Sequence, residues 1–174
     1  MPTSFAIPME AARITVSTSF FMSALWKSRH TESFRLAYRS VVPRRYFFLD
    51  RHVLHALAVT ELVLGVGLLG PDPISQCAAF IACGMLGTFL IVVSRQRDTT
   101  SGCGCWGSTR PVPRSVYVAR NSLLLAAAVL AAIPTEGELG SATAVAVALG
   151  ITSSILIMSI PQVVGVLHPI DIET

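Results

Sequence analysis

Residues Ser75–Ser94 read SQCAAFIACGMLGTFLIVVS, a run without a single charged side chain. A helix needs about 20 mostly apolar residues to cross the hydrocarbon core of a bilayer. Residues Ser141–Ile160 form a second run of the same character. The whole chain has 52% hydrophobic and only 13% charged residues, about half the charged share of a soluble domain. This composition excludes disorder, a coiled coil and a water-soluble core, and it predicts a membrane protein.

Three further stretches are long and apolar enough to be spans. Val53–Gly70 and Val116–Ile133 qualify although each holds one charged residue. Phe5–Trp26 is the least apolar, because it is rich in Ser and Thr and holds two charges. We expect a retained helix there rather than a signal peptide, since no Lys or Arg precedes Arg13 and no small-residue cleavage site follows Trp26. The sequence therefore predicts one all-α integral membrane domain over residues 1–174, with spans at about 5–26, 53–70, 75–94, 116–133 and 141–160.

The charged residues indicate how the spans are oriented. The long segments Lys27–His52 and Arg95–Ser115 are basic, whereas Pro134–Gly140 carries two glutamates and no cation. The positive-inside rule places both basic loops in the cytoplasm. The net charge of +3 is explained by these loops, so we expect the lipid bilayer and no nucleic acid as a partner. Residues Lys27–His52 are too many for a structureless loop, and aromatic residues stand among their arginines. An interfacial segment and a plain basic loop both remain open.

The stretch Ser101–Ser108 reads SGCGCWGS and holds the residues best suited to chemistry. Cys103 and Cys105 can close a very small disulfide ring, because Gly104 supplies the backbone freedom that the ring needs. Such strained disulfides are easily reduced and are typical of redox sites. Nearby arginines favour the reactive thiolate. A purely structural turn is one alternative. Zinc is another, but a structural zinc site needs four ligands and this loop offers two thiols, so we expect no metal.

Other patterns in the chain predict packing rather than chemistry. Cys77 and Cys83 are six residues apart on one predicted helix, so their side chains point in different directions and cannot pair. Gly65, Gly67 and Gly70 match a dinucleotide-binding spacing, but they lie inside one apolar run. There they predict a close helix–helix contact. We identify no cofactor from the sequence. A quinone is possible as a cofactor, but no residue pattern in the sequence supports it.

Glu61, Arg13 and Arg120 are charges inside predicted spans. A charge at that depth is expensive and normally faces the bundle interior beside a partner. Glu61 lies about 12 Å into its span, and a long arginine side chain could reach it from either direction. We therefore expect an intramembrane charge pair of Glu61 with Arg13, while Arg120 stays a second candidate. Such a pair could hold helices together or form a proton or ligand site.

Taken together, these residues resemble the MauE family (methylamine-utilisation protein E) of the DoxX-like membrane proteins. The most specific match is CGCWG at Cys103–Gly107, which is usually CGCFG in the family. It is followed by an arginine–asparagine pair at the next helix, here Arg120 and Asn121. Further matches are ELVLGVGLL at Glu61–Leu69 and FFMSALWKSRHTESF at the end of the first span. The resemblance covers about residues 10–133, and the last helix resembles a variable addition.

The resemblance implies a DoxX-like four-helix transmembrane bundle plus a C-terminal fifth helix, in a multi-pass protein of the bacterial inner membrane. Family members are linked to the maturation of secreted proteins that contain disulfides or cofactors, often beside a thioredoxin-like protein. This implies a thiol–disulfide oxidoreductase with a thioredoxin-like partner and a protein substrate. The residues implied are the dithiol Cys103 and Cys105, with Gly104, Trp106, Gly107, Arg120 and Asn121 in support.

Two alternatives stand beside this redox role. One is a carrier of a small solute or lipophilic cofactor that uses the charges inside the bundle. The other is a non-catalytic subunit of a larger membrane complex, with Cys103-Gly104-Cys105 as a tight turn. The predicted topology also raises a question, because it puts the cysteines in the cytoplasm while the substrates of such maturation lie outside. The dithiol would then take electrons from a cytoplasmic thioredoxin system, or it would dip back into the bundle as a re-entrant loop.

Overall fold

The fold was analysed in a computed structural model of the chain, which describes residues 3–42, 44–95, 113–134 and 143–167. These residues form helices and short turns, and none of them forms a strand, as the sequence predicts. The helices in chain order are α1 (Thr3–Arg29), α2 (Thr31–Val41), the 3₁₀ helix η1 (Arg44–Leu49), α3 (Asp50–Leu68), α4 (Ile74–Arg95), α5 (Arg114–Ala131) and α6 (Thr143–Leu167).

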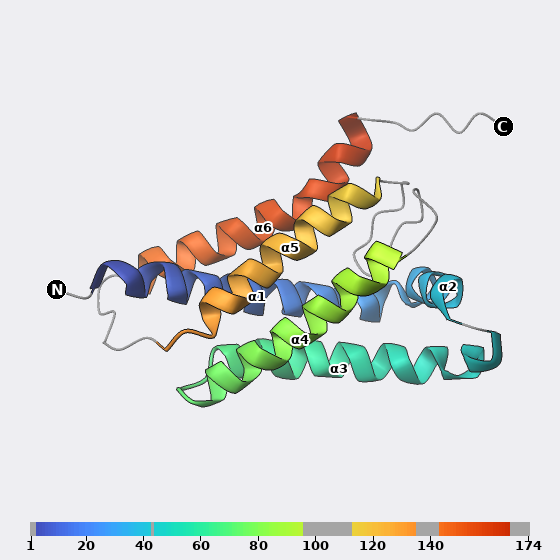
Figure 1. Cartoon of the computed structure of the whole chain (residues 1–174), viewed down its shortest axis with the longest axis horizontal. Coiled ribbons are helices and arrows are strands. Elements are labelled where there is room, and N and C mark those ends of the chain that lie inside the picture. The colour runs from blue at the N-terminus through green and yellow to red at the C-terminus, as the bar shows by residue number, and fades with distance from the viewer. Residues whose placement is uncertain (1–2, 43, 96–112, 135–142, 168–174) are drawn as a thin grey trace.

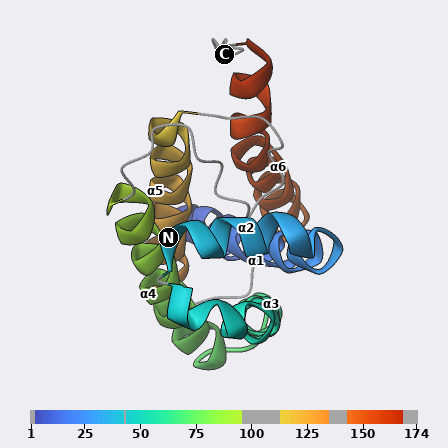
Figure 2. The same cartoon turned by 90° about the vertical axis from the view of Figure 1, so that its right-hand side faces the viewer.

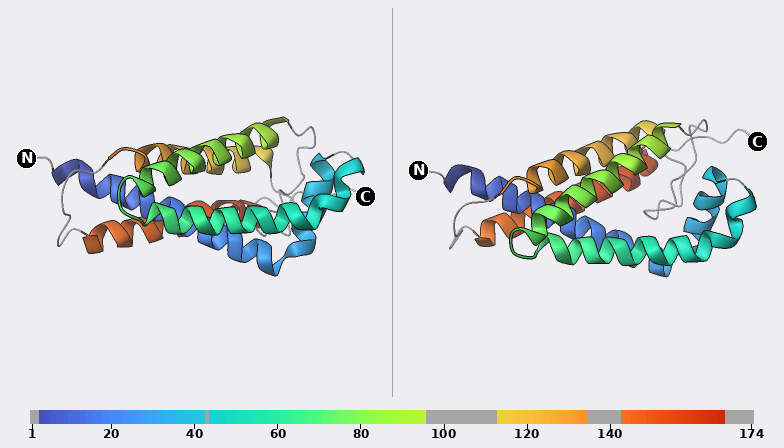
Figure 3. Two further views of the ribbon diagram at one scale, coloured as in Figure 1. Left: turned by 90° about the horizontal axis from the view of Figure 1, so that it is seen from below. Right: turned by 60° about the horizontal axis from the view of Figure 1, so that its bottom comes forward.

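The five long helices form an elongated bundle, in which α4, α5 and α6 are inclined to α1 and α3 (Figures 1 and 3). Helix α1 is central, because it packs against α3, α5 and α6, while α4 packs against α3 and α5. Within the described ranges, three segments have the length and apolar composition to cross a membrane: Arg44–Leu68, Ile74–Arg95 and Thr143–Val164. Helix α1 is rich in Ser and Thr and holds four charged residues, α5 holds two arginines, and the two helices pack against each other.

The polar residues of α1 point into the bundle and find partners there. The Ser17 hydroxyl donates to the Gly65 carbonyl of α3 at 2.7 Å. The Thr15 hydroxyl donates to the Gly150 carbonyl of α6 at 3.1 Å, and other buried hydroxyls on α1 are bonded in the same way. Buried hydroxyls that are bonded across helices hold a bundle together in lipid. The low hydropathy of Phe5–Trp26 thus reflects the central position of this helix.

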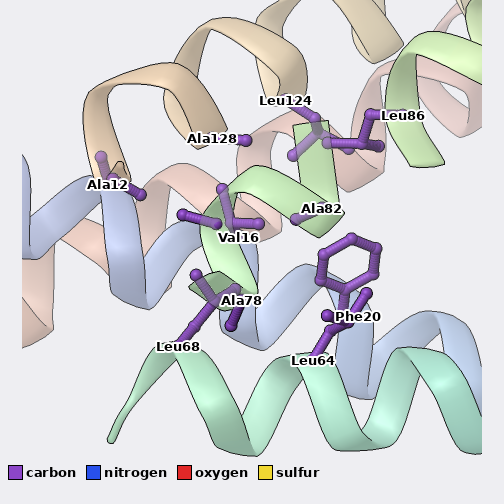
Figure 4. Close-up of a cluster of buried hydrophobic side chains, with 12 residues drawn as sticks. Ala12, Val16, Phe20, Leu64, Leu68, Ala78, Ala82, Leu86, Leu124 and Ala128 are labelled. Atoms are coloured by element: carbon purple, nitrogen blue, oxygen red, sulfur yellow. The ribbon is translucent and has the colours of Figure 1, made fainter. Parts of the chain in front are cut away.

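The apolar core lies where α1, α3, α4 and α5 meet (Figure 4). Phe20 from α1 is its largest side chain, and half of the buried residues in it are alanines, which let helices approach closely. The predicted packing role of the glycines in α3 is confirmed, because a Cβ at Gly65 would lie 3.2 Å from the Phe21 ring. A Cβ at Gly67 would lie 3.0 Å from the Cβ of Ala78 on α4.

Helix α6 is seated closely on α1. A Cβ at Gly150 would lie 2.6 Å from the Cβ of Ile14 and 2.8 Å from the Ala11 carbonyl oxygen, so only glycine fits at this contact. One turn further along, the hydroxyls of Ser19 and Ser154 are hydrogen-bonded at 3.0 Å. The last helix is therefore an integral part of the bundle.

The segment between α1 and α3 is helical rather than a plain loop. Helix α2 runs across the end of the bundle, crosswise to the long helices (Figure 2). Its Phe34 side chain is buried, whereas Leu36 is 67% exposed. The end of α4 and the start of α5 lie at this same end of the bundle (Figure 1). A crosswise helix with aromatic and basic residues at the end of a membrane bundle favours the interfacial segment over the plain loop.

Candidate functional site

The centre of the candidate site is a buried ion pair between Lys27 of α1 and Glu61 of α3. The Lys27 ammonium lies 2.5 Å from Oε1 and 2.6 Å from Oε2 of Glu61. The Ser23 hydroxyl donates to the same carboxylate at 3.0 Å and accepts from Lys27 at 2.5 Å. The two charged side chains are 0% and 2% exposed. A carboxylate and an ammonium sealed from water in this way are stable only as a pair.

Helix geometry explains how Lys27 reaches this depth. Side chains on a helix point back toward its N-terminus, so the Lys27 side chain lies along α1 toward Ser23, four residues earlier. The predicted pairing of Glu61 with Arg13 is therefore corrected: Glu61 is paired, but with Lys27. Sequence reasoning missed Lys27 and Ser23 because it ended the first span at Trp26 and assigned the lysine to the basic loop. The four-residue spacing of Ser23 and Lys27 was the signal that could have identified them.

Arg13 instead connects three parts of the opposite end of the bundle. Its guanidinium donates to Glu10 at 3.1 Å on its own helix and to Asp72 at 3.0 Å in the turn between α3 and α4. It also donates to the carbonyl oxygens of Ala131 at 3.2 Å and Ile133 at 3.4 Å, at the end of α5. The Arg13 residue is 5% exposed. This network fixes the relative positions of α1, α5 and the α3–α4 turn.

A third polar cluster holds α2 against the start of α3. Asp50 accepts from Arg35 at 3.0 Å and from Arg39 at 2.7 Å. Arg35 also donates to Glu32 at 2.7 Å. The hydrogen bond to Asp50, together with the charge of that carboxylate, raises the pKa of the Arg35 guanidinium above its usual range. The crosswise orientation of α2 is thus fixed by charge as well as by the buried ring of Phe34.

The predicted dithiol Cys103 and Cys105, with Gly104, Trp106 and Gly107, lies outside the described residues. The helix ends that flank it are described. The Arg114 guanidinium at the start of α5 donates to the Ser94 carbonyl near the end of α4. This bond joins the end of α4 to the start of α5, the two helices on either side of the segment that holds the cysteines.

Two supporting residues lie on the helix that follows the loop. Arg120 is 1% exposed, and Asn121 is half-buried on the same turn of α5. Arg120 lies six residues, about 9 Å, into the helix from Arg114. It is not joined to Glu61 by any of the ion pairs found between described side chains. The structure therefore brings Ser23, Lys27 and Glu61 together, and it places Arg120 on another helix, α5.

The remaining cysteines behave as the helix spacing predicts. Cys77 is exposed on α4 and Cys83 is half-buried on the same helix, and both are free thiols. Among the described residues, no three His, Cys, Asp or Glu side chains are grouped so that they could hold a metal ion.

These features define the class of the protein. The described residues include three helices long and apolar enough to cross a membrane, and an ion pair is buried in the bundle interior. Both features are typical of a multi-pass membrane protein in contact with the lipid bilayer. The chain belongs to the family of methylamine utilisation protein MauE, whose match covers residues 6–134. This confirms the resemblance found in the sequence. The matched range extends from α1 past the end of α5, stops before α6, and includes Glu61 and both loop cysteines. No curated protein and no solved structure matches the chain.

Proposed function

We propose that the chain is an integral membrane thiol–disulfide redox protein that assists the maturation of a partner protein containing disulfides or a cofactor. The observation that carries this proposal is the Cys103-Gly104-Cys105 spacing inside the family match. The helices on either side of this segment are joined by the hydrogen bond from Arg114 to the Ser94 carbonyl. The name of the family, methylamine utilisation protein, is consistent with a role in preparing another protein for that metabolism.

The chemistry is a two-step exchange in which the electrons balance. One thiolate of the pair attacks the partner's disulfide, forms a mixed disulfide and releases one partner thiolate. The second cysteine then attacks the mixed disulfide, which releases the second partner thiol and closes the Cys103–Cys105 bond. The partner gains two electrons and the protein loses two, which a thioredoxin-like dithiol restores. Arginines near the loop, including Arg114 and the buried Arg120, favour the thiolate form.

The architecture that accompanies this function is a DoxX-like unit formed by α1, α3, α4 and α5, to which α6 is added. The end of the family match at residue 134, before α6 begins at Thr143, supports this division. We place the protein in the bacterial inner membrane with α2 and the loop cysteines on the cytoplasmic side, because that end carries the arginines. The thioredoxin-like partner then meets the dithiol from the cytoplasm, and a substrate that lies outside is reached only if the loop dips back into the bundle.

Thiol trapping in cells tests the proposal. Cys103→Ser and Cys105→Ser are made separately, and the resolving-cysteine variant is expected to stay attached to its partner. It should then gain mass on a non-reducing gel, and the adduct should disappear with reductant. In the wild type, alkylation with a mass-adding maleimide should reveal reduced and oxidised populations of the pair. Cys77→Ser and Cys83→Ser are matched controls, since both thiols are free on α4, and neither should trap a partner.

Two results would assign the loop differently. If the Cys103–Cys105 pair stays fully reduced under oxidising growth, and the double serine variant behaves as the wild type, the loop is a structural turn. The non-catalytic subunit then becomes the better account. Zinc in the purified protein that is lost together with the two thiols would indicate a metal site instead. The carrier alternative loses support from Glu61, because Lys27 and Ser23 occupy its carboxylate.

A further inference from the structure

The 3₁₀ helix η1 and its neighbours present arginines that form no ion pair with the described carboxylates. Arg44 and Arg45 of η1 and Arg51 of α3 are all exposed, as is Arg29 at the end of α1. None of the four is joined to a carboxylate by the ion pairs found between described side chains. We call these four residues the basic rim.

The carboxylates that the structure describes in this region are engaged with other cations. Asp50 accepts from both Arg35 and Arg39, and Glu32 accepts from Arg35. Lys27 is neutralised by Glu61 in the bundle interior. Within the described residues, the positive charge of the basic rim is therefore not balanced by an ion pair.

Three of the four arginines of the basic rim, Arg44, Arg45 and Arg51, lie at one end of a candidate membrane span. Helix η1 continues directly into α3, and the two together form the candidate span Arg44–Leu68. Phe48 of η1 is 74% exposed and Tyr46 is 39% exposed. The Arg45 guanidinium lies 4.8 Å from the centre of the Tyr46 ring. Exposed aromatic rings beside arginines at a span end are typical of the membrane–water interface.

We propose that the basic rim binds the headgroups of anionic phospholipids, with Arg44 and Arg45 as its centre. Guanidinium groups match phosphate oxygens in geometry and charge. The exposed rings of Tyr46 and Phe48 select a lipid over a soluble anion, because they are placed to enter the bilayer beside the phosphate. A zwitterionic headgroup cancels part of the attraction, so phosphatidylglycerol is preferred over phosphatidylcholine.

Lipid binding to the full-length purified protein tests this proposal. The protein in mild detergent is titrated with phosphatidylglycerol or phosphatidylcholine, and bound lipids are counted by native mass spectrometry. The wild type should bind phosphatidylglycerol more tightly. The double variant Arg44→Gln/Arg45→Gln should lose about fivefold in that affinity for each arginine replaced, with phosphatidylcholine binding unchanged. Arg44→Lys/Arg45→Lys keeps the charge and should retain most of the preference.

Arg95→Gln is the matched control, because it removes one exposed charge at the same end of the bundle from α4 instead of η1. If the basic rim is the site, Arg95→Gln should change the affinity for phosphatidylglycerol by less than about twofold. An equal loss in Arg95→Gln overturns the proposal in favour of a general effect of net charge. Displacement of the lipid by inorganic phosphate would show a soluble-anion site, and the absence of any headgroup preference in the wild type would also overturn it.

Discussion

The ammonium of Lys27 bridges both carboxylate oxygens of Glu61, at 2.5 and 2.6 Å, across 34 residues of sequence. The pair joins the central helix α1 to α3 in the interior of the bundle. It belongs to the region that matches the MauE family. Neither residue lines the cavity of about 430 Å³ found between α1 and α6. The pair therefore acts within the contact between two helices.

Glu61→Gln should destabilise the protein by about 3–5 kcal/mol, because it leaves the Lys27 ammonium buried without its carboxylate. The measurement is thermal unfolding in detergent, with wild type in the same buffer. Ser23→Ala is the matched control and should cost only about 1 kcal/mol, since it removes a hydrogen bond and no charge. The double variant Lys27→Met/Glu61→Leu should recover most of the lost stability. Unchanged melting of Glu61→Gln would mean that water reaches this carboxylate.

Arg13→Met should loosen the end of the bundle opposite α2. The variant loses the bonds to Asp72 and to the carbonyl oxygens at the end of α5. We expect a loss of about 3 kcal/mol in the free energy of unfolding. Faster hydrogen exchange should accompany it in the α3–α4 turn and at the end of α5. Glu10→Gln should lower the free energy of unfolding by less than Arg13→Met does, because Arg13 keeps its bond to Asp72. An equal loss in the two variants would show that the interhelical bonds of Arg13 contribute little.

Gly150→Ala should weaken the seating of α6 on α1, because the new methyl group meets Ile14 and the Ala11 carbonyl within 2.8 Å. Overpacking of this kind costs about 1–3 kcal/mol. Gly84→Ala on α4 is the matched control, since a Cβ there has no atom within 4 Å. Thermal unfolding of both variants gives the comparison. Equal stability of the two would contradict a close contact between α6 and α1.

Helix α5 should cross the membrane although it holds Arg114 and Arg120. Single cysteines at Ser115 and Pro134, near its two ends, are introduced after all four native cysteines are changed to serine. A membrane-impermeant maleimide should label Pro134→Cys on intact cells and Ser115→Cys only after permeabilisation. Labelling of both positions from one side would show that α5 does not span.

The long helices were predictable from the sequence, because an apolar run that crosses a bilayer has few alternatives to a helical conformation. The observed α4, Ile74–Arg95, differs from the predicted span Ser75–Ser94 by one residue at each end. The partner of Glu61 was not predictable in the same way. Hydropathy fixes where a helix lies but not which of its faces meets a neighbour, so Arg13, Arg120 and Lys27 could not be ranked by depth alone.

The segment Lys27–His52 shows the same limit. Its composition predicted either an interfacial segment or a loop, and the choice depends on Asp50, which draws Arg35 and Arg39 together. Arg35 lies 15 positions and Arg39 lies 11 positions before Asp50. Contacts over such separations leave no periodic signal in the sequence. The cysteine loop was found from its motif alone, and its redox role stays a prediction.

The polarity of α1 has a consequence for how the protein is made. Charged residues raise the cost of releasing a helix from the translocon into lipid, by about 3 kcal/mol each near the helix centre. Of the long helices described, α1 is the earliest in the chain. Yet Lys27 finds its carboxylate in α3, and Arg13 finds its carbonyl partners in α5. Helix α1 is therefore synthesised before the helices that hold the partners of its charged residues. Its position in the bilayer becomes stable only when those later helices have been inserted and have formed these bonds.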